Sequence, residues 1–190
     1  GTSVLYGAQA PAAPAASAPA PVEASAGGVE IVFRPDPYVL DGRFANNGWL
    51  QELPRPLSKL TWDAAAHVSA RTAERLGVTR GDIVSIAYAG RKVQLPIWVM
   101  PGTADDVVVV YYGFGRPKAG RVGANVGFDA FGVRTSATPW FGGGAEITPT
   151  GESYTLASTQ NHFAMEGRHP VRVVDAEAYR NDPAVVHAMG

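Results

Sequence analysis

The 190-residue chain contains no cysteine. These residues therefore cannot form disulfides, zinc–thiolate sites or iron–sulfur ligation. The chain also has no excess of basic residues: it contains 16 Lys and Arg and 17 Asp and Glu. This balance argues against nucleic acid as a main partner, since such proteins carry a basic patch. The longest apolar run, Val107 to Tyr112, is strand-length, so we expect no direct membrane span, which needs roughly 18 residues.

The first 28 residues differ in composition from the rest of the chain. Gln9 to Gly28 consists almost entirely of Ala, Pro, Ser and Gly, with too few large apolar groups to offset the entropy lost on ordering. We expect residues 1–28 to be an extended or disordered linker and residues 29–190 to form one folded domain. The chain begins with Gly and not Met, so we expect it to be part of a longer polypeptide.

Short apolar segments separated by turn residues dominate the folded part. We predict strands at Val29–Phe33, Ile83–Ala89, Val93–Val99, Val107–Tyr112, Gly132–Arg134, Glu146–Thr148, Tyr154–Ala157 and Val171–Val174. Val107–Tyr112 is suited to burial on both faces, and Pro96 suggests an edge or bulge position. The sequence Asn46-Asn47-Gly48 predicts a turn.

Few helices are predicted, and all of them are short. Ser69 is a suitable N-cap for a helix that ends at Arg75 or Leu76, with Gly77 as its terminator. A helical turn capped by its first residue is expected at Asp175–Arg180. Together the elements indicate a mostly β fold with short helices, closed into a barrel and not a doubly wound sheet.

A glycine-rich segment with basic residues, Gly113–Gly127, follows the most apolar predicted strand. Glycines allow backbone N–H groups to approach a phosphate, and Arg116, Lys118 and Arg121 have the charge to neutralise it. However, Lys118 occupies the position of the third glycine in a dinucleotide fingerprint, and no helical pattern follows. Two interpretations stay open: contact with a ligand or partner, or a long loop across the barrel with solvated basic residues.

The known catalytic templates are absent from the sequence. None of the four histidines, at positions 67, 162, 169 and 187, has metal-ligand spacing, and there is no nucleophile elbow. The adjacent Asp105 and Asp106 lie in a predicted turn and do not form an acid–base pair. His67 is expected at the surface or in the core with its polar atoms satisfied, whereas His162, in a polar stretch, is the best candidate for a histidine facing a site. We therefore predict no catalytic residue and no metal ligand.

The aromatic residues have two interpretations. The four tryptophans, at positions 49, 62, 98 and 140, lie in or next to predicted loops and turns. They are suited to filling the ends of a barrel, and they are also enriched in buried protein–protein contacts. Asp63, next to Trp62, is interpreted as a structural residue that orients a loop or caps a turn.

Two groups of segments resemble a known family. Asn46–Asp63, with Ala73-Glu74-Arg75-Leu76-Gly77 and Gly81-Asp82-Ile83-Val84, resembles the C-terminal dinucleotide-binding domain of molybdopterin oxidoreductases, whose fold is a double-psi β-barrel. The second group is similar to the large periplasmic iron–sulfur subunit of bacterial alternative complex III, a quinol:electron-acceptor oxidoreductase. This second group consists of Tyr112–Arg116, Ala119–Gly123, Val126–Ala130, Leu156–His162 and Met165–Arg168.

The resemblance implies a non-catalytic structural domain without a bound cofactor in this chain. Its partners would be other domains of the same subunit and neighbouring subunits of a respiratory complex, on the periplasmic side of the bacterial inner membrane. Iron–sulfur clusters would lie elsewhere in the parent subunit.

The alternative is a true molybdopterin guanine dinucleotide-binding domain of a molybdoenzyme of the polysulfide-reductase or dimethyl-sulfoxide-reductase type. Under either interpretation the candidate cofactor-facing residues are Arg116 and Arg121, for the pyrophosphate, with Asn125, Gln160 and His162. A free-standing binding module is a third possibility, against which the linker and the missing Met both weigh.

Overall fold

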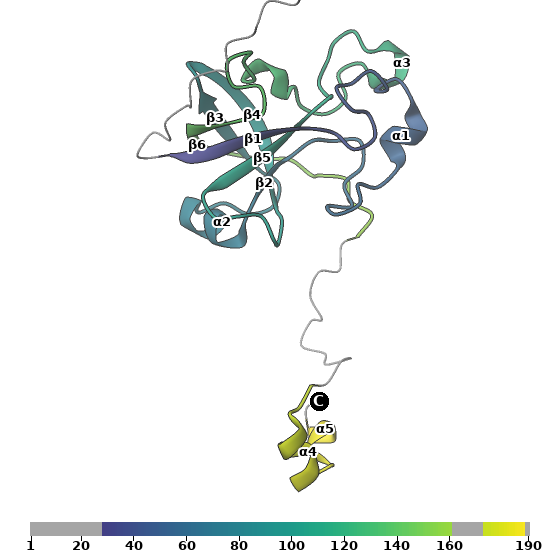
Figure 1. Ribbon diagram of the computed structural model, residues 1–190. Helices are drawn as coiled ribbons and strands as arrows, with labels where there is room; N and C mark the ends of the chain where they lie inside the picture. Colours follow the sequence, from purple (N-terminus) through teal and green to yellow (C-terminus); the bar gives the residue numbers. More distant parts are fainter. Residues whose placement is uncertain (1–27, 161–172, 189–190) are drawn as a thin grey trace, which may run out of the picture.

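The structure, a computed structural model, describes residues 28–160 and 173–188 (Figure 1). Within these residues six strands close into one barrel in the order β1-β5-β2-β4-β3-β6. The strands are β1 (Val29–Pro35), β2 (Ala66–Val68), β3 (Asp82–Tyr88), β4 (Arg91–Val99), β5 (Val107–Tyr112) and β6 (Phe141–Ser153). The predicted fold class, mostly β with a closed barrel and short helices, is confirmed.

The helices of the described residues have at most seven residues each. They are α1 (Gly48–Glu52), α2 (Ala70–Leu76), α3 (Gly120–Gly123), the 3₁₀ turn η1 (Ala130–Gly132), α4 (Ala176–Asn181) and α5 (Val185–Ala188). No helix in the described ranges is long and apolar enough to span a bilayer. The predicted linker lies almost wholly outside the described residues, and the division at residue 29 stays a prediction.

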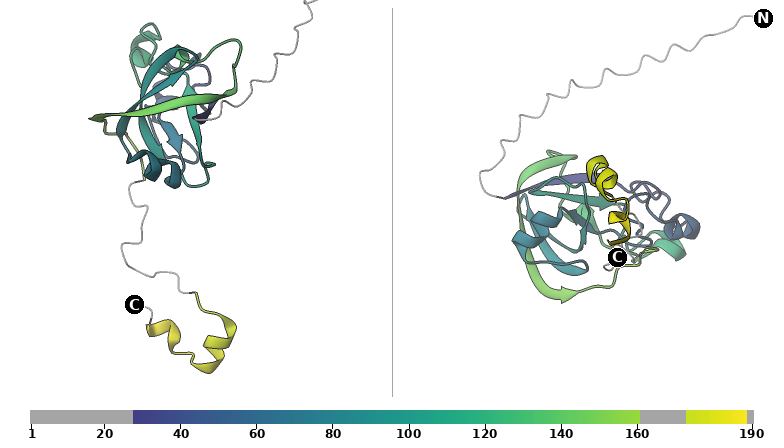
Figure 2. Two further views of the ribbon diagram at one scale, coloured as in Figure 1. Left: turned by 90° about the vertical axis from the view of Figure 1, so that its left-hand side faces the viewer. Right: turned by 90° about the horizontal axis from the view of Figure 1, so that it is seen from below.

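Parallel and antiparallel pairs together close the barrel. β1 pairs in parallel with β5 and β2 with β4, while the other neighbouring strands are antiparallel. The long β6 crosses the full width of the barrel (Figure 2). Pro96 lies inside β4 and not at an edge: it faces Ile83 of β3, and the pairing with β2 begins one residue later, at Ile97. A residue without an N–H is tolerated at this change of partner.

The core follows the two-residue period of the strands. Alternate residues point into the barrel and are fully buried, including Ile31, Val84, Ile86, Leu95, Ile97, Val108 and Val110. The prediction that β5 is buried on both faces is wrong, because only one of its faces lies in this core. Val107, Val109 and Tyr111 on the outward face are half-buried. Each fully buried aliphatic side chain contributes about 1.5 to 3 kcal/mol.

Capping residues determine where the short helices begin and end. The Ser69 hydroxyl accepts from the N–H of Thr72 at 3.0 Å, and Gly77 ends α2 in the left-handed region, as predicted. The Asp175 carboxylate caps α4, which is also confirmed. The predicted turn at Asn46–Gly48 is confirmed in part: Asn46 ends a run of turn residues, and Gly48 begins α1, whose N-cap Asn47 accepts from the N–H of Leu50 at 3.3 Å.

Several strand predictions are wrong or incomplete. The segment predicted as a strand at Gly132–Arg134 overlaps the end of η1, which the Asp129 carboxylate caps by accepting from the N–H of Phe131 at 2.9 Å. Tyr154–Ala157 joins no strand ladder. Glu146–Thr148 is the middle of the thirteen-residue β6. Of Val171–Val174, the first two residues lie outside the described ranges and the other two are not in a strand. The three-residue β2 is too short to be predicted from its pattern.

Because the barrel is closed and tightly packed, we predict that truncating a buried side chain strongly lowers the stability of the domain. We expect Ile97→Ala to lower the free energy of unfolding by about 2 to 5 kcal/mol, because the cavity it leaves is surrounded by rigid strands. Lys92→Ala, at an exposed position of the same strand, is the control and is expected to stay within about 0.5 kcal/mol of the unsubstituted chain. Urea unfolding followed by circular dichroism measures both, and equal losses would contradict the assigned interior.

Candidate functional site

The glycine-rich segment 113–127 packs against residues 39–46 at one end of the barrel. Within it lies the four-residue α3, a helix that the sequence did not predict. The Arg116 guanidinium donates to the carbonyl of Gly42, and the N–H of Val122 donates to the Asn46 side chain at 2.8 Å. Figure 1 shows α1 and α3 side by side at this end. The two loops therefore support each other.

The glycines of this segment are required by contacts within the chain. A Cβ on Gly115 would lie 2.2 Å from the backbone nitrogen of Asp129. A Cβ on Gly123 would lie 2.5 Å from the carbonyl oxygen of Ala45. Any side chain at these two positions would push the backbones apart. The close approach that the glycines permit is thus an approach to other parts of this domain.

Several backbone N–H groups of the segment have partners in the protein. The hydrogen bonds are Gly115 to Val126 (2.7 Å), Asn125 to Arg116 (2.9 Å) and Val122 to the Asn46 side chain (2.8 Å). A loop that cradles a phosphate directs such N–H groups at the anion. These three N–H groups are instead used within the domain, while the side chains of the segment remain available.

The predicted site residues lie in two places. Arg116, Arg121 and Asn125 share the glycine-rich segment, where Arg121 and Asn125 are exposed and Arg116 is half-buried with its Nε lacking a hydrogen-bond partner. Gln160 is exposed on a different segment, next to Ser158, whose hydroxyl accepts from its N–H at 3.3 Å. His162 lies outside the described residues. The assignment of all five to a cofactor stays a prediction.

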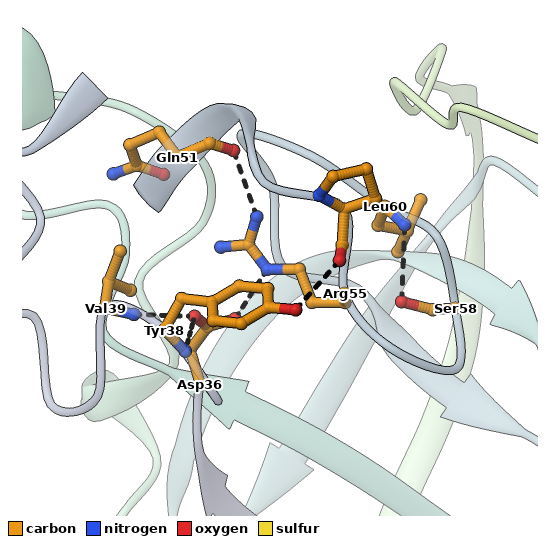
Figure 3. Close-up of polar contacts among 8 residues, drawn as sticks. Asp36, Tyr38, Val39, Gln51, Arg55, Ser58 and Leu60 are labelled. Carbon is orange, nitrogen blue, oxygen red and sulfur yellow. Dashed lines mark hydrogen bonds and ion pairs between the residues drawn. The ribbon is translucent and has the colours of Figure 1, made fainter. Parts of the chain in front are cut away.

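A buried ion pair, which the sequence did not reveal, organises the neighbouring loop (Figure 3). The Arg55 Nε donates to the Asp36 carboxylate at 2.8 Å, and both side chains are almost completely buried. The other oxygen of Asp36 accepts from the N–H groups of Tyr38 and Val39, both at 2.9 Å. The Arg55 Nη1 donates to the Gln51 carbonyl at 3.2 Å. The pair thus joins the end of β1 to the end of α1.

Aromatic rings enclose the same guanidinium. The ring of Phe114 lies 5.0 Å from the Arg55 Cζ and the ring of Tyr38 lies 5.8 Å away, in cation–π contact. The Tyr38 hydroxyl donates to the Pro54 carbonyl at 3.1 Å, which fixes that ring. Because Phe114 belongs to the glycine-rich segment, Arg55 connects both loops at this end of the barrel.

A groove of about 910 Å³ follows the outward faces of β1, β2 and β5. Its apolar lining includes Val32, Leu57, Met100, Val107, Val109 and Tyr111. None of the described site residues predicted from the sequence lines it. The sequence missed the groove because an uninterrupted apolar strand is typical of burial on both faces.

His67 forms part of the wall of this groove from β2. Its ring lies 5.0 Å from that of Tyr111, and burial lowers the pKa of the imidazole from 6.5 to about 4. The imidazole is therefore neutral at physiological pH. The expectation of a surface or core histidine is met in part, because His67 is buried yet borders a cavity.

Asp63 lies at the same groove and has the structural role expected for it. The Tyr154 hydroxyl donates to its carboxylate at 3.1 Å, which ties the segment after β6 to the loop before β2. Burial raises the pKa of Asp63, and the hydrogen bond from Tyr154 partly opposes this. Among the described residues, no group of three His, Asp or Glu side chains is placed to hold a metal ion. The arrangement suits positioning and binding.

Comparison with known proteins gives one family match. The model of the "Molydopterin dinucleotide binding domain" family matches residues 45–142, which include α1, α2, α3 and strands β2 to β5. No curated protein matches the chain. Among solved structures, acetylene hydratase from Pelobacter acetylenicus is similar with 15% sequence identity and a TM-score of 0.46. That match covers 63% of this chain, which spans only 18% of that enzyme.

The buried ion pair predicts a strong effect of removing one partner. We expect Arg55→Met to lower the free energy of unfolding by about 3 to 5 kcal/mol, since Asp36 would stay buried without its cation. Urea unfolding measures the loss.

Two further variants make this prediction specific. Arg75→Met removes an exposed pair with Asp106 and is expected to cost less than about 1 kcal/mol. The double variant Asp36→Asn/Arg55→Met leaves no buried charge, so it is expected to be more stable than Arg55→Met alone. A double variant less stable than the single one would contradict the importance of the unpaired charge.

The pKa of His67 predicts a pH dependence of stability. Because folding favours the neutral ring, its contribution is complete above pH 6.5 and is lost as the pH falls from 6.5 to about 4. The loss at low pH amounts to about 3 kcal/mol. Urea unfolding at several pH values, compared with His67→Gln, isolates this part of the slope. A slope in that window unchanged by the substitution would disprove the assignment.

Proposed function

The chain belongs to the molydopterin dinucleotide binding domain family, and we propose that it is a non-catalytic scaffold domain of a larger oxidoreductase subunit. The observation that carries this proposal is the internal packing of the glycine-rich segment. Gly115 and Gly123 are required by contacts with Asp129 and Ala45, and the N–H groups of Gly115, Val122 and Asn125 are bonded within the chain. The part of the domain best suited in sequence to grip a phosphate instead connects two of its own loops.

The barrel itself is proposed to be a double-psi β-barrel. Two observations support this topology. The closed sheet contains two parallel pairs, β1 with β5 and β2 with β4, and neither pair is joined by a direct connection between its own two strands. The antiparallel contact between β2 and β5 places the two pairs next to each other.

The parent protein is proposed to be the large subunit of an alternative complex III-type quinol:electron-acceptor oxidoreductase. The resemblance of segments such as Asn46–Asp63 and Tyr112–Arg116 supports this assignment. In such a parent, the domain would lie on the periplasmic side of the bacterial inner membrane, in contact with other domains and subunits of a respiratory complex. Because the chain has no cysteine, iron–sulfur clusters would be ligated by other parts of the parent.

The second candidate is a domain that binds a molybdopterin dinucleotide. It is favoured by the family membership and by the Arg116 Nε, which is buried without a hydrogen-bond partner. When bound, the group would supply a molybdenum centre for oxygen-atom or electron transfer elsewhere in the enzyme. The exposed side chains of Arg121 and Asn125 would then contact its phosphates, with Arg121 neutralising charge and Asn125 donating through its amide.

The metal and pterin content of the parent protein separates the two functions. We expect the intact parent, purified from its source, to contain iron but no molybdenum or tungsten by elemental analysis, and no fluorescent pterin after oxidative extraction. Stoichiometric molybdenum with pterin would overturn the scaffold function. In that case Arg121→Ala and Asn125→Ala, compared with Arg91→Ala on the β3–β4 hairpin, would be expected to reduce the retained pterin.

A further inference from the structure

Helix α1 buries a polar residue and exposes a tryptophan. Gln51 is completely buried, and its side-chain amide donates to the Ala45 carbonyl at 2.9 Å. Trp49, two residues earlier, is 86% exposed. A surface helix normally buries its apolar side chains and exposes its polar ones. The exposure of so large an apolar side chain indicates that it meets another apolar surface.

Further exposed apolar residues lie at the end of α1, on the loop before it and on α3. Phe44, Leu53 and Val122 are all exposed, and together with Trp49 they make up what we call the α1–α3 face. Three contacts hold their segments together. The N–H of Leu53 donates to the Trp49 carbonyl at 3.0 Å, that of Asn47 to the Phe44 carbonyl at 3.0 Å, and that of Val122 to the Asn46 side chain at 2.8 Å. The face is thus formed by a rigid, hydrogen-bonded part of the domain.

The two interpretations of the aromatic residues can now be separated. Trp98 and Phe114 are buried in two smaller hydrophobic clusters beside the barrel core, so packing explains them. Trp49 contributes nothing to such packing because its side chain is almost fully in solvent. Exposed tryptophan is the residue type most enriched among the energetically dominant contacts of protein interfaces. Trp49 is therefore suited to the centre of an interface.

Two basic side chains accompany the α1–α3 face. Lys118 and Arg121 lie just before and within α3, and both are exposed. The ion pairs formed within residues 28–160 and 173–188 involve Arg43, Arg55, Arg71 and Arg75 as cations, and so leave these two available. Their charge selects a partner with carboxylates around an apolar centre.

We propose that the α1–α3 face docks an adjacent domain of the parent protein, with apolar groups against Trp49 and carboxylates against Lys118 and Arg121. This inference rests on the proposed function, in which the chain is one domain of a larger subunit. A second copy of the chain fits less well, because a symmetric contact would bring the basic side chains of both copies together. An anionic membrane surface also fits less well, since such binding typically uses about four to eight clustered basic residues.

Carbodiimide cross-linking of the intact parent protein tests the contact. The reagent joins an amine to a carboxylate only where the two already touch, and the chain has three lysines, at positions 59, 92 and 118. We expect Lys118 to be joined to an Asp or Glu outside residues 1–190 of the same polypeptide. Lys92, exposed on β4 near the β3–β4 turn, is the internal control and is expected to give no such product.

Hydroxyl-radical labelling tests the apolar centre. Trp49 is expected to be labelled rapidly in the separate 190-residue chain and several-fold more slowly in the intact parent. The charge reversal Lys118→Glu/Arg121→Glu is expected to restore much of that labelling in the parent, whereas Arg91→Glu/Lys92→Glu, with the same change in charge, leaves it slow. Trp98, which is only 2% exposed in the folded chain, reports whether each variant is folded.

Three results would overturn the inference. They are equal labelling of Trp49 in the chain and the parent, protection of Trp49 in the chain alone by self-association at increasing concentration, and protection only on addition of phosphatidylglycerol vesicles. These outcomes are independent of the metal analysis. A parent protein that lacks molybdenum but leaves Trp49 open would retain the scaffold function and lose only this docking surface.

Discussion

The buried ion pair between Asp36 and Arg55 fixes the end of the barrel where all the unusual features lie. Asp36 ends the regular part of β1, and its second oxygen holds the N–H groups of Tyr38 and Val39, so the chain must turn there. Arg55 reaches back across 19 residues to meet it and holds the Gln51 carbonyl as well. Burying two charges is costly, and only a geometry with these additional hydrogen bonds offsets the loss of water. The pair therefore selects one conformation for the whole loop between β1 and β2.

The exposure of Trp49 on α1 follows from that conformation. With the carbonyl of Gln51 bound to Arg55 and its amide bound to Ala45, the helix presents Gln51 to the interior. Trp49 then has to point outward. The glycine-rich segment closes over the same loop, because Phe114 packs on Arg55 and Gly123 allows the backbone to touch Ala45. A segment that looks like a phosphate-binding loop in sequence thus serves as the second half of a structural support.

Features determined by neighbours in the chain were predictable. The Ser69 and Asp175 caps, the Gly77 terminator and most strands depend on local pattern, and the structure contains them. Features determined by distant residues were not predictable. No local signal indicates that Arg55 pairs with Asp36, that Gln51 is buried while Trp49 is exposed, or that three residues around His67 form a strand between β4 and β5. The predicted cofactor residues were selected on type and proximity in sequence, which do not show that N–H groups such as those of Gly115 and Val122 are already bonded within the chain.

The core and the outer face are separate parts of this domain. The interior residues, from Ile31 to Val110, are buried by the strands together with residues of α2 and η1, and none of the apolar residues of the α1–α3 face contributes to this core. The interior packing therefore does not depend on what covers Trp49. Docking of the α1–α3 face would use a loop whose conformation the Asp36–Arg55 pair has already fixed. Preorganisation of this kind reduces the entropy lost on association, which is the property that a scaffold in a multi-domain redox subunit needs.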